Sequence, residues 1–190
     1  MVKTSPANTL VFLDRDGVIN RPKVINGKPF APRSLNHFYI YKNAITGIRL
    51  LKSLGVTIVV VTNQPDVGNG LLSKQALDEM HNYMMQKVPL DVVLACLHSQ
   101  KENCTCRKPN TAMFHKAVET LDRHFDNKYM VGDRVSDMDA GNAFGCKNIF
   151  IDRGYKETKG VPAEFVTKNL LSAALLIKYE ICFGASLNQK

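Results

Sequence analysis

The feature that most constrains this 190-residue chain is a pair of short apolar runs that each stop abruptly at acidic residues. Residues 10–13 run directly into Asp14-Arg15-Asp16-Gly17, and residues 129–131 run into Gly132-Asp133. A buried parallel strand presents polar side chains at its carboxyl end, where open α/β sheets bind ligands. Carboxylates from two such strands can hold one Mg²⁺. The sequence therefore predicts a parallel sheet with an acidic metal site at one edge.

The rest of the chain alternates between two apolar patterns. Stretches of branched residues are typical of buried strands, and apolar residues three or four positions apart are typical of helices, so their alternation predicts a parallel sheet covered by helices. We expect strands at residues 10–13, 56–61, 92–95, 129–131 and 148–151. We expect helices whose buried faces carry Ala44, Ile48 and Leu51; Leu77, Met80 and Met84; and Met113, Ala117, Val118 and Leu121.

Local signals place several element boundaries. Ser73 and Ser136 are plausible N-caps, and Gly55 is placed to end the first helix. Between residues 17 and 62 we expect one helix and an irregular, proline-containing segment, which leaves no room for an inserted cap domain. We expect residues 1–190 to form a single domain with an open site. Its last helix, at residues 162–183, should close a sheet edge with a stripe of Val166, Leu170, Ala174 and Ile177.

Composition narrows the class of partner. The formal charge is +8, which suits an anionic ligand, but Lys and Arg are scattered from Lys3 to Lys190 and no basic run is interleaved with aromatic residues. No apolar run approaches the length of a membrane span or a signal peptide. We therefore expect a cytoplasmic monomer that acts on a small phosphorylated metabolite and binds neither nucleic acid nor membrane.

The acidic strand ends suit phosphate ester hydrolysis. An anionic nucleophile must approach an anionic ester, so the catalyst has to cancel charge and hold the attack in line. Asp14 would attack phosphorus to form an aspartyl-phosphate, and Asp16 would protonate the leaving oxygen and later deprotonate water. Gly17 lets the backbone turn away. A lone Asp-Gly is usually only a turn, so the prediction depends on several such signals occurring together.

Further residues supply the metal and phosphate ligands. Mg²⁺ would take the Asp14 carboxylate, the Asp16 backbone carbonyl and Asp133, with Asp137 supporting that shell. Thr62 and Asn63 end a predicted strand and offer a hydroxyl and an amide, Lys108 offers a fixed positive charge, and Arg107 can bind a phosphate or substrate oxygen through two hydrogen bonds.

A second metal site is predicted from Cys96, His98, Cys104 and Cys106. Two close pairs of thiol and imidazole ligands have the number and types for tetrahedral Zn²⁺ with no open position, so we interpret the site as structural. The alternative is three reduced cysteines and a loop histidine. Because the loop ends at Arg107-Lys108, bound zinc would fix the position of two cationic side chains.

These residues resemble the haloacid dehalogenase superfamily of aspartate-nucleophile phosphatases, from about Leu10 to Arg153. The segments DRDGVIN, VVVTNQ, CxH and CxC followed by RKP, and MVGD resemble its zinc-containing branch, which includes D-glycero-D-manno-heptose 1,7-bisphosphate phosphatases and histidinol-phosphate phosphatases. The resemblance implies a Rossmann-like three-layer α/β sandwich with a central parallel sheet, no large cap domain and a zinc-binding loop. It implies Mg²⁺ and Zn²⁺ as cofactors. It assigns catalysis to Asp14, Asp16, Thr62 and Lys108, and substrate binding to Asn63, Gln64, Arg107 and Arg134.

The substrate remains open between the two activities of that branch. The DRDGVIN segment resembles the heptose enzymes, which remove the 7-phosphate of the bisphosphate. Against this, Pro65-Asp66 follows Gln64, and Asn69 occupies a position where the heptose enzymes usually carry arginine. Arg134 and the short zinc loop resemble the histidinol-phosphate type. A nucleic-acid 3′-phosphatase, or a zinc-loop module that binds nucleic acid, is a third reading.

Overall fold

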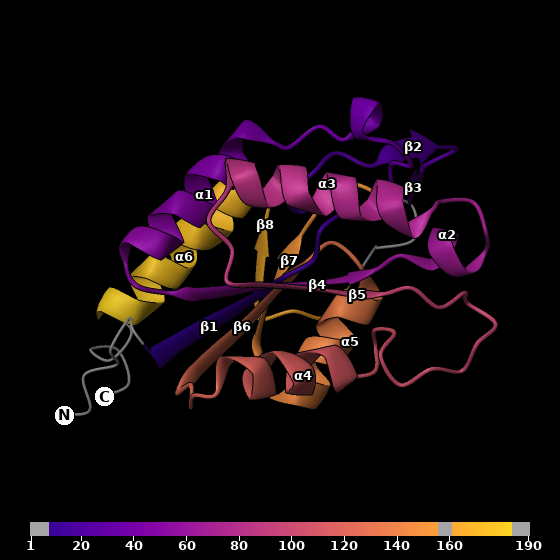
Figure 1. Cartoon of the computed structure of the whole chain (residues 1–190). Helices are drawn as coiled ribbons and strands as arrows, with labels where there is room; N and C mark the ends of the chain where they lie inside the picture. Colours follow the sequence, from indigo (N-terminus) through magenta and orange to yellow (C-terminus); the bar gives the residue numbers. More distant parts are fainter. Residues whose placement is uncertain (1–7, 156–160, 184–190) are drawn as a thin grey trace.

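The computed structural model describes residues 8–155 and 161–183, and its centre is one six-stranded sheet (Figure 1). The sheet order is β5-β4-β1-β6-β7-β8, and every neighbouring pair is parallel. The strands are β1 (Thr9–Leu13), β4 (Thr57–Asn63), β5 (Val92–Cys96), β6 (Asn127–Gly132), β7 (Lys147–Ile151) and β8 (Phe165–Thr167). A separate antiparallel hairpin consists of β2 (Lys23–Ile25) and β3 (Lys28–Phe30).

Helices cover both faces of the sheet, which makes the fold a three-layer α/β sandwich of the Rossmann type (Figure 1). One face is covered by α1 (Lys42–Ser53), α3 (Lys74–Lys87) and α6 (Leu170–Phe183), and the other by α4 (Ala112–Leu121) and α5 (Val135–Phe144). Successive β1 residues point to opposite faces, so Val11 and Leu13 join the first core and Leu10 and Phe12 the second. Burial on both faces explains the continuous apolar runs.

The chain order places β1 at the centre of the sheet. After β1 the chain adds β4 and β5 on one side, then returns past β1 to add β6, β7 and β8 on the other. The neighbours of β1 are therefore β4 and β6, and the Asp14 amide donates to the Val131 carbonyl at 3.0 Å. Reversal of the strand order beside one strand creates a crevice at the carboxyl ends, where α/β sheets bind ligands.

The five predicted strands and the buried positions of the first three predicted helices are confirmed, except that Val118 and Leu121 of α4 are only half-buried. The single helix predicted for residues 162–183 is wrong at its start. Phe165–Thr167 instead forms β8 on the edge of the sheet, and Val166 is 60% exposed. The helix begins after Asn169, whose side-chain oxygen accepts a hydrogen bond from the Ser172 amide at 3.0 Å, as an N-cap does.

Two of the three predicted helix boundaries are confirmed. The Ser73 hydroxyl accepts from the Ala76 amide and caps α3, and Gly55 follows α1 with a positive φ of 78°. Ser136 is not an N-cap, because it already lies inside α5, which begins at Val135. Arg134 occupies the cap position, and its backbone amide donates to Asp137 Oδ2 at 3.1 Å.

The segment between β1 and α1 is more regular than predicted. It contains the β2-β3 hairpin and a short 3-10 turn, η2 (Leu35–His37), rather than irregular chain alone. Prolines 22, 29 and 32 are compatible with a two-stranded ribbon because both of its strands are edges. No inserted domain lies between β1 and β4. In the described part of the chain, no helix combines the length and apolarity needed to cross a bilayer.

Candidate active site

A pocket of about 670 Å³ opens at the carboxyl ends of β1 and β4, beside the start of α5. Its base carries the polar residues that follow the strands. Its mouth is bordered by the β2-β3 hairpin, the short helix α2 (Pro65–Gly68) and the loop after β5, which lie at the same end of the molecule (Figure 1). The pocket is lined at its base by Asp14, Asp16, Thr62, Asn63, Lys108 and Asp137.

Lys108 lies between two carboxylates at the pocket base. Its Nζ is 2.7 Å from Asp14 Oδ1 and 2.7 Å from Asp137 Oδ1, and it also donates to the Val61 carbonyl at 2.6 Å. The lysine side chain is 1% exposed, so its charge is almost entirely shielded from water. A charge buried in this way is tolerated only when it is paired and fully hydrogen-bonded, and here all three ammonium donors have acceptors.

The charges at the base shift one another's pKa values. Burial raises the pKa of Asp14 to about 6, although the Lys108 charge acts in the opposite direction. Burial alone would lower the pKa of Lys108, but attraction to Asp137 and Asp14 outweighs it and raises that pKa. The lysine is therefore charged at neutral pH, and Asp14 is largely ionised.

Asp133, at the end of β6, completes the acidic cluster. Its carboxylate is fully buried, and the Tyr155 hydroxyl lies beside it. Burial, then repulsion from Asp14 and Asp137, raises its pKa well above the usual value. One carboxylate oxygen from each of these three residues lies within 4.8 Å of the others. Buried carboxylate oxygens gathered this closely fit a small divalent cation.

Gly17 is required by this cluster. It has a φ of 91°, and a Cβ added there would lie 1.7 Å from Asp133 Oδ2. A side chain at this position would therefore collide with the carboxylate and also strain the backbone. The predicted role of Gly17 in turning the backbone is confirmed, and the structure adds that the absence of a side chain leaves room for Asp133.

The Asp16 carboxylate is held by five hydrogen bonds. Arg15 donates three of them, from Nε to Oδ2 at 3.2 Å and from Nη2 to both oxygens at 3.1 and 2.9 Å. Asn20 donates to Oδ1 at 2.8 Å and Gln64 to Oδ2 at 2.7 Å. Asp16 still borders the pocket, so one well-fixed carboxylate is available to a molecule that enters it.

The residues that end β4 have different environments. Thr62 borders the pocket, and its Oγ1 accepts from Gln64 Nε2 at 2.9 Å. Asn63 also borders the pocket but forms reciprocal hydrogen bonds with the backbone of Lys108. Gln64 is predicted to contact substrate, yet it is fully buried and lies behind Asp16. Its contact with a ligand would therefore be indirect, through Asp16 and Thr62.

Three arginines border the pocket away from its base. Arg107 and Arg134 are the two predicted from sequence. Arg134 Nη2 donates to the Pro29 carbonyl of the hairpin at 3.1 Å, and Arg107 Nη1 is buried without a hydrogen-bond partner in the described structure. Arg33, which follows the hairpin, was missed, and its Nε donates to Asp66 of α2 at 2.7 Å. The pocket walls are therefore cationic beyond the acidic base.

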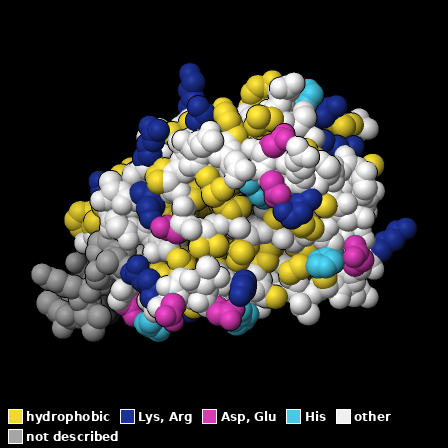
Figure 2. Space-filling model, viewed as in Figure 1, with side chains coloured by type: hydrophobic (Ala, Val, Ile, Leu, Met, Phe, Trp, Pro, Cys, Tyr) yellow, Lys and Arg dark blue, Asp and Glu magenta, His cyan; other side chains and the backbone are white. Residues whose placement is uncertain are grey.

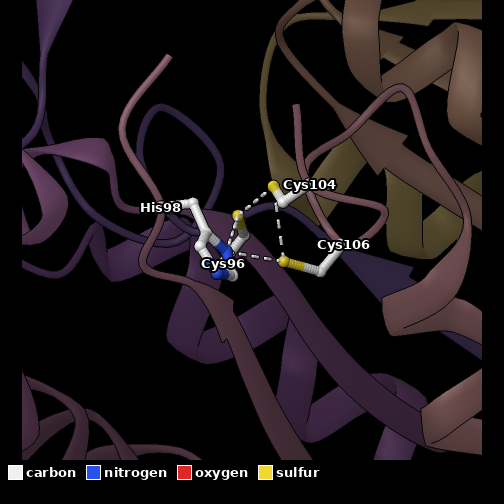
Figure 3. Close-up of side chains that lie close together, drawn as sticks. All are labelled: Cys96, His98, Cys104 and Cys106. Carbon is white, nitrogen blue, oxygen red and sulfur yellow. Dashed lines mark hydrogen bonds between the residues drawn. The ribbon is translucent and has the colours of Figure 1, made fainter. Parts of the chain in front are cut away.

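The four predicted zinc ligands come together at the end of β5, which carries Cys96, and in the loop that follows it (Figure 3). Cys96 Sγ lies 3.6 Å from Cys104 Sγ, and Cys104 Sγ lies 3.7 Å from Cys106 Sγ. His98 Nδ1 lies 3.7 Å from Cys96 Sγ and 3.2 Å from Cys106 Sγ. Thiolates bound about 2.3 Å from a tetrahedral zinc ion stand about 3.8 Å apart. The cluster therefore has both the ligand types and the spacing that zinc requires.

This cluster is joined to the pocket through a short stretch of chain. Lys108 lies two residues after Cys106, and its backbone is hydrogen-bonded on both sides to Asn63 at the end of β4. Burial raises the pKa of the Cys96 thiol to about 12. Since a zinc ion binds the thiolate form, metal binding at this site would release protons.

Positive charge on the face shown in Figure 2 is scattered rather than gathered. Lys and Arg side chains alternate there with acidic and apolar ones, without the continuous basic stripe that an extended nucleic-acid strand requires. The arginines that border the pocket suit a compact anionic ligand instead.

No role in the site was predicted from the sequence for Arg15 or His81. Arg15 is the largest fully buried side chain, and its Nη1 lies 3.1 Å from His81 Nε2 on α3. The available signal was the position of Arg15 between two acidic residues at the end of a buried strand, where a solvated arginine would be unexpected. Nothing in the local sequence of α3 marks His81, because its partner lies 66 positions away.

Comparisons with known proteins agree with this geometry. The HAD-hydrolase-like family model matches residues 105–173. The D-glycero-beta-D-manno-heptose-1,7-bisphosphate 7-phosphatase of Haemophilus influenzae is 30% identical over 186 residues, covering 90% of this chain and 97% of that protein. The histidine biosynthesis bifunctional protein HisB of Blochmanniella floridana is 29% identical over 146 residues, 74% of this chain and 40% of that protein.

A solved structure extends the comparison to three dimensions. The crystal structure of D,D-heptose 1,7-bisphosphate phosphatase from B. bronchiseptica, complexed with magnesium and phosphate, superposes with a TM-score of 0.77. The match covers 90% of this chain and 99% of that one, at 25% sequence identity. Together with the cluster of aspartates and Lys108 at the strand ends, these similarities identify the chain as a phosphatase, a phosphoric monoester hydrolase, and it belongs to the haloacid dehalogenase superfamily.

Proposed function

We propose that the chain hydrolyses a sugar bisphosphate through an aspartyl-phosphate on Asp14, with Asp16 as the general acid and base. The observation that carries the proposal is the meeting of Asp14, Lys108 and Asp137 at the base of one pocket, with the buried Asp133 carboxylate within 4.8 Å of the other two carboxylates. A buried carboxylate beside a fixed ammonium group, with cation ligands at its side, supplies the charge compensation that phosphoryl transfer demands.

The reaction divides into two displacements. In the first, an Asp14 oxygen forms a bond to phosphorus while the bond to the leaving sugar oxygen breaks, and Asp16 gives that oxygen a proton. In the second, Asp16 takes a proton from water, which attacks phosphorus and frees Asp14 and inorganic phosphate. Lys108 holds Asp14 Oδ1 at 2.7 Å, so Oδ2 is the oxygen that would attack. Thr62 and Lys108 would stabilise the phosphoryl oxygens.

The cation that fits the acidic cluster is Mg²⁺, which would be held by Asp14, Asp133 and the Asp16 backbone carbonyl. Asp137 would support these ligands through its hydrogen bonds to the backbone beside Asp133. When bound, Mg²⁺ would reduce the repulsion between the nucleophile and the phosphate. Asp137 Oδ2 accepts from the Asp133 and Arg134 amides, so it orients the strand end that carries Asp133. Zn²⁺ would occupy the Cys96, His98, Cys104 and Cys106 cluster in a structural role.

The proposed substrate is D-glycero-D-manno-heptose 1,7-bisphosphate, from which the 7-phosphate is removed. Two features support it. The relative from Haemophilus influenzae, which this chain matches over almost its whole length, carries that activity in its name. The pocket also has cationic walls, formed by Arg33, Arg107 and Arg134, that could bind a second phosphate while the first reacts.

Histidinol phosphate is the alternative substrate. The similarity to HisB and the presence of Asn69 and Asp66 at the pocket mouth favour it. Histidinol phosphate carries an amine, which the arginines of the pocket walls would repel, so we place it second. A nucleic-acid 3′-phosphatase, or nucleic-acid binding by the zinc loop, is less well supported because basic residues on the displayed face are scattered (Figure 2).

Phosphate release distinguishes the candidates. The purified protein is assayed with Mg²⁺ on heptose 1,7-bisphosphate, histidinol phosphate and a 3′-phosphorylated oligonucleotide, and kcat/KM is compared. The proposal requires the largest kcat/KM for the heptose bisphosphate and a product that retains its 1-phosphate. A larger value for histidinol phosphate or the oligonucleotide would assign the site to that substrate instead.

The remaining expectations concern the molecule as a whole. We propose that residues 1–190 act as one domain and as a monomer, because a single copy of the chain brings together the nucleophile, its lysine and the candidate cation ligands in one site. None of the five cysteines, all of which lie in the described residues, forms a disulfide, which supports a reducing compartment such as the cytoplasm. Light scattering of the purified protein tests the monomer, since a mass near twice 21.2 kDa would refute it.

A further inference from the structure

We infer that His81 on α3 is a positioning residue for catalysis: by accepting a hydrogen bond from Arg15, it fixes the guanidinium that orients Asp16. The inference rests on the proposed role of Asp16 as general acid and base. It concerns residues behind the pocket, since neither His81 nor Arg15 borders it. Their influence on bound substrate would therefore act only through Asp16.

Arg15 is held rigidly enough to serve as a template. Its side chain is 0% exposed, and it makes an ion pair with Asp16 at 2.9 Å. The guanidinium carbon lies 5.3 Å from the centre of the Phe38 ring. A planar guanidinium that lies over a ring and is paired with both oxygens of a carboxylate leaves that carboxylate little freedom to rotate.

His81 occupies the remaining side of the guanidinium. Arginine can only donate hydrogen bonds, so His81 Nε2, 3.1 Å from Arg15 Nη1, must accept, and the imidazole is neutral with its proton on Nδ1. Burial, reinforced by the Arg15 charge, lowers the pKa of His81 to about 4, which agrees with a neutral ring.

The helix that carries His81 is fixed in turn. The Ser73 hydroxyl caps the start of α3, and Leu77, Met80 and Met84 bury the same face of the helix in the core. His81 therefore cannot move away from Arg15 without disturbing this packing. His81 Nε2 is therefore the atom through which the packed helix α3 fixes Arg15, and Arg15 in turn fixes the Asp16 carboxylate.

Loss of that acceptor would leave a buried arginine donor without a partner. An unpaired buried donor is costly, so the guanidinium would turn toward another acceptor and take the Asp16 carboxylate with it. Displacement of an acid by about 1 Å can lower a rate by up to about 100-fold. The loss should depend on how strongly the leaving group needs a proton.

The test compares His81→Leu, which removes the acceptor, with His81→Gln, which replaces it by an amide oxygen. Each is assayed on the sugar phosphate and on 4-nitrophenyl phosphate, whose phenolate leaves with little protonation. We use kcat/KM because it reports the phosphoryl transfer step and not the later hydrolysis. We expect His81→Leu to lose about 10-fold or more on the sugar phosphate and less than about 3-fold on the aryl phosphate. His81→Gln should recover most of the loss.

Met84→Ala is the matched control, because it truncates another buried side chain of α3 without removing a hydrogen bond. It should lower the melting temperature while leaving the ratio of the two kcat/KM values unchanged. Should His81→Leu fail to fold, His81→Met fills a similar volume with only a weak acceptor and takes its place.

Equal losses on both substrates, or His81→Gln behaving like His81→Leu in a folded protein, would overturn the inference. Failure of the proposed function itself looks different. If Asp14 were not the nucleophile, the Asp14→Asn variant would release phosphate as fast as the unaltered protein does. The role of His81 and the proposed function are therefore tested by separate measurements.

Discussion

The Asn63 side chain and the Lys108 backbone are joined by two reciprocal hydrogen bonds: the Lys108 amide donates to Asn63 Oδ1 at 3.0 Å, and Asn63 Nδ2 donates to the Lys108 carbonyl at 3.1 Å. One end of β4 thus holds the backbone of the lysine that contacts Asp14. The other support for that backbone is the loop of Cys104 and Cys106, which precedes it in the chain. The position of one ammonium group therefore depends on a strand end and on a candidate metal loop.

Removal of zinc should therefore abolish activity even when Mg²⁺ is in excess. Without the ion, the loop before Lys108 loses the metal–ligand bonds that fix its conformation. Lys108 would then no longer be held in place to contact Asp14 Oδ1. Cys104→Ser should show the same loss and a lower melting temperature, whereas Cys182→Ser, an exposed free thiol on α6, should show neither. Metal analysis should find zinc bound to the unaltered protein. Full turnover by protein that metal analysis shows to be zinc-free would contradict this prediction.

Replacement of Asp14 by Asn should lower kcat by at least about 1,000-fold, because the amide is nearly isosteric but cannot attack phosphorus. The fold should persist, since Lys108 keeps its pairing with Asp137. Asp139→Asn is the control, because this exposed carboxylate lies on α5 near the site without lining the pocket. Phosphate release measures the activity, and circular dichroism the fold. Comparable turnover in the two variants would exclude Asp14 as the nucleophile.

The acid limb of the pH profile should follow the ionisation of Asp14. Burial raises the pKa of Asp14 to about 6, and only the ionised form attacks, so kcat/KM should fall as the pH decreases through about 6. A bound divalent cation favours the carboxylate, so raising the Mg²⁺ concentration should move this limb to lower pH. A limb that stays fixed as Mg²⁺ is varied would show that another group controls it.

Gly17→Ala should weaken cation binding and catalysis together. The new Cβ would lie 1.7 Å from Asp133 Oδ2, so the carboxylate would have to move. Gly145→Ala separates this collision from the backbone strain, because Gly145 also has a positive φ, of 75°, but a Cβ there would meet nothing within 4 Å. Mg²⁺ titration of activity should show a higher half-saturation for Gly17→Ala only. An equal effect in both variants would attribute the loss to strain.

Protonation of His81 should destabilise the folded protein in acid. The folded pKa of about 4 lies below the unfolded value of 6.5, so the unfolded state binds the proton first and stability is lost as the pH falls from 6.5 toward 4. The contribution is at most about 3 kcal/mol, because a tenfold difference in proton affinity between the folded and unfolded states corresponds to about 1.4 kcal/mol. Urea unfolding across this range should show a smaller pH dependence for His81→Gln, and identical curves would disprove the assignment.

The sequence predicted the parts of the site that lie close together along the chain. Asp14 and Asp16 follow the same strand, and the four zinc ligands fall within the eleven-residue segment from Cys96 to Cys106. Such patterns need no knowledge of how distant segments pack. The strand ends that carry Asp14 and Asp133 were also predicted to meet, because parallel strands align their carboxyl ends at one edge.

The parts that were missed depend on distant contacts or on weak local preference. His81 and Arg15 meet only because α3 packs in the core on the sheet face lined by Val11 and Leu13, and Arg33 meets Asp66 at the pocket mouth. β8 has three residues, and Val166 within it matched the helical spacing of the residues that follow, so pattern alone favoured a longer helix. Ser136 resembled a cap by residue type, but Asp137 accepts from the Arg134 amide and starts α5 earlier.

The residues that act on phosphorus and the residues that border the pocket mouth come from different segments of the chain, and this separation affects how substrate selectivity can change. The groups assigned to bond making sit on the central strands and on Lys108, whereas Phe30, Arg33 and Leu71 come from the hairpin region and the stretch after α2. Exchanges at the mouth can alter which molecule is admitted while the groups that act on phosphorus stay in place. Selectivity can therefore drift without passing through inactive forms.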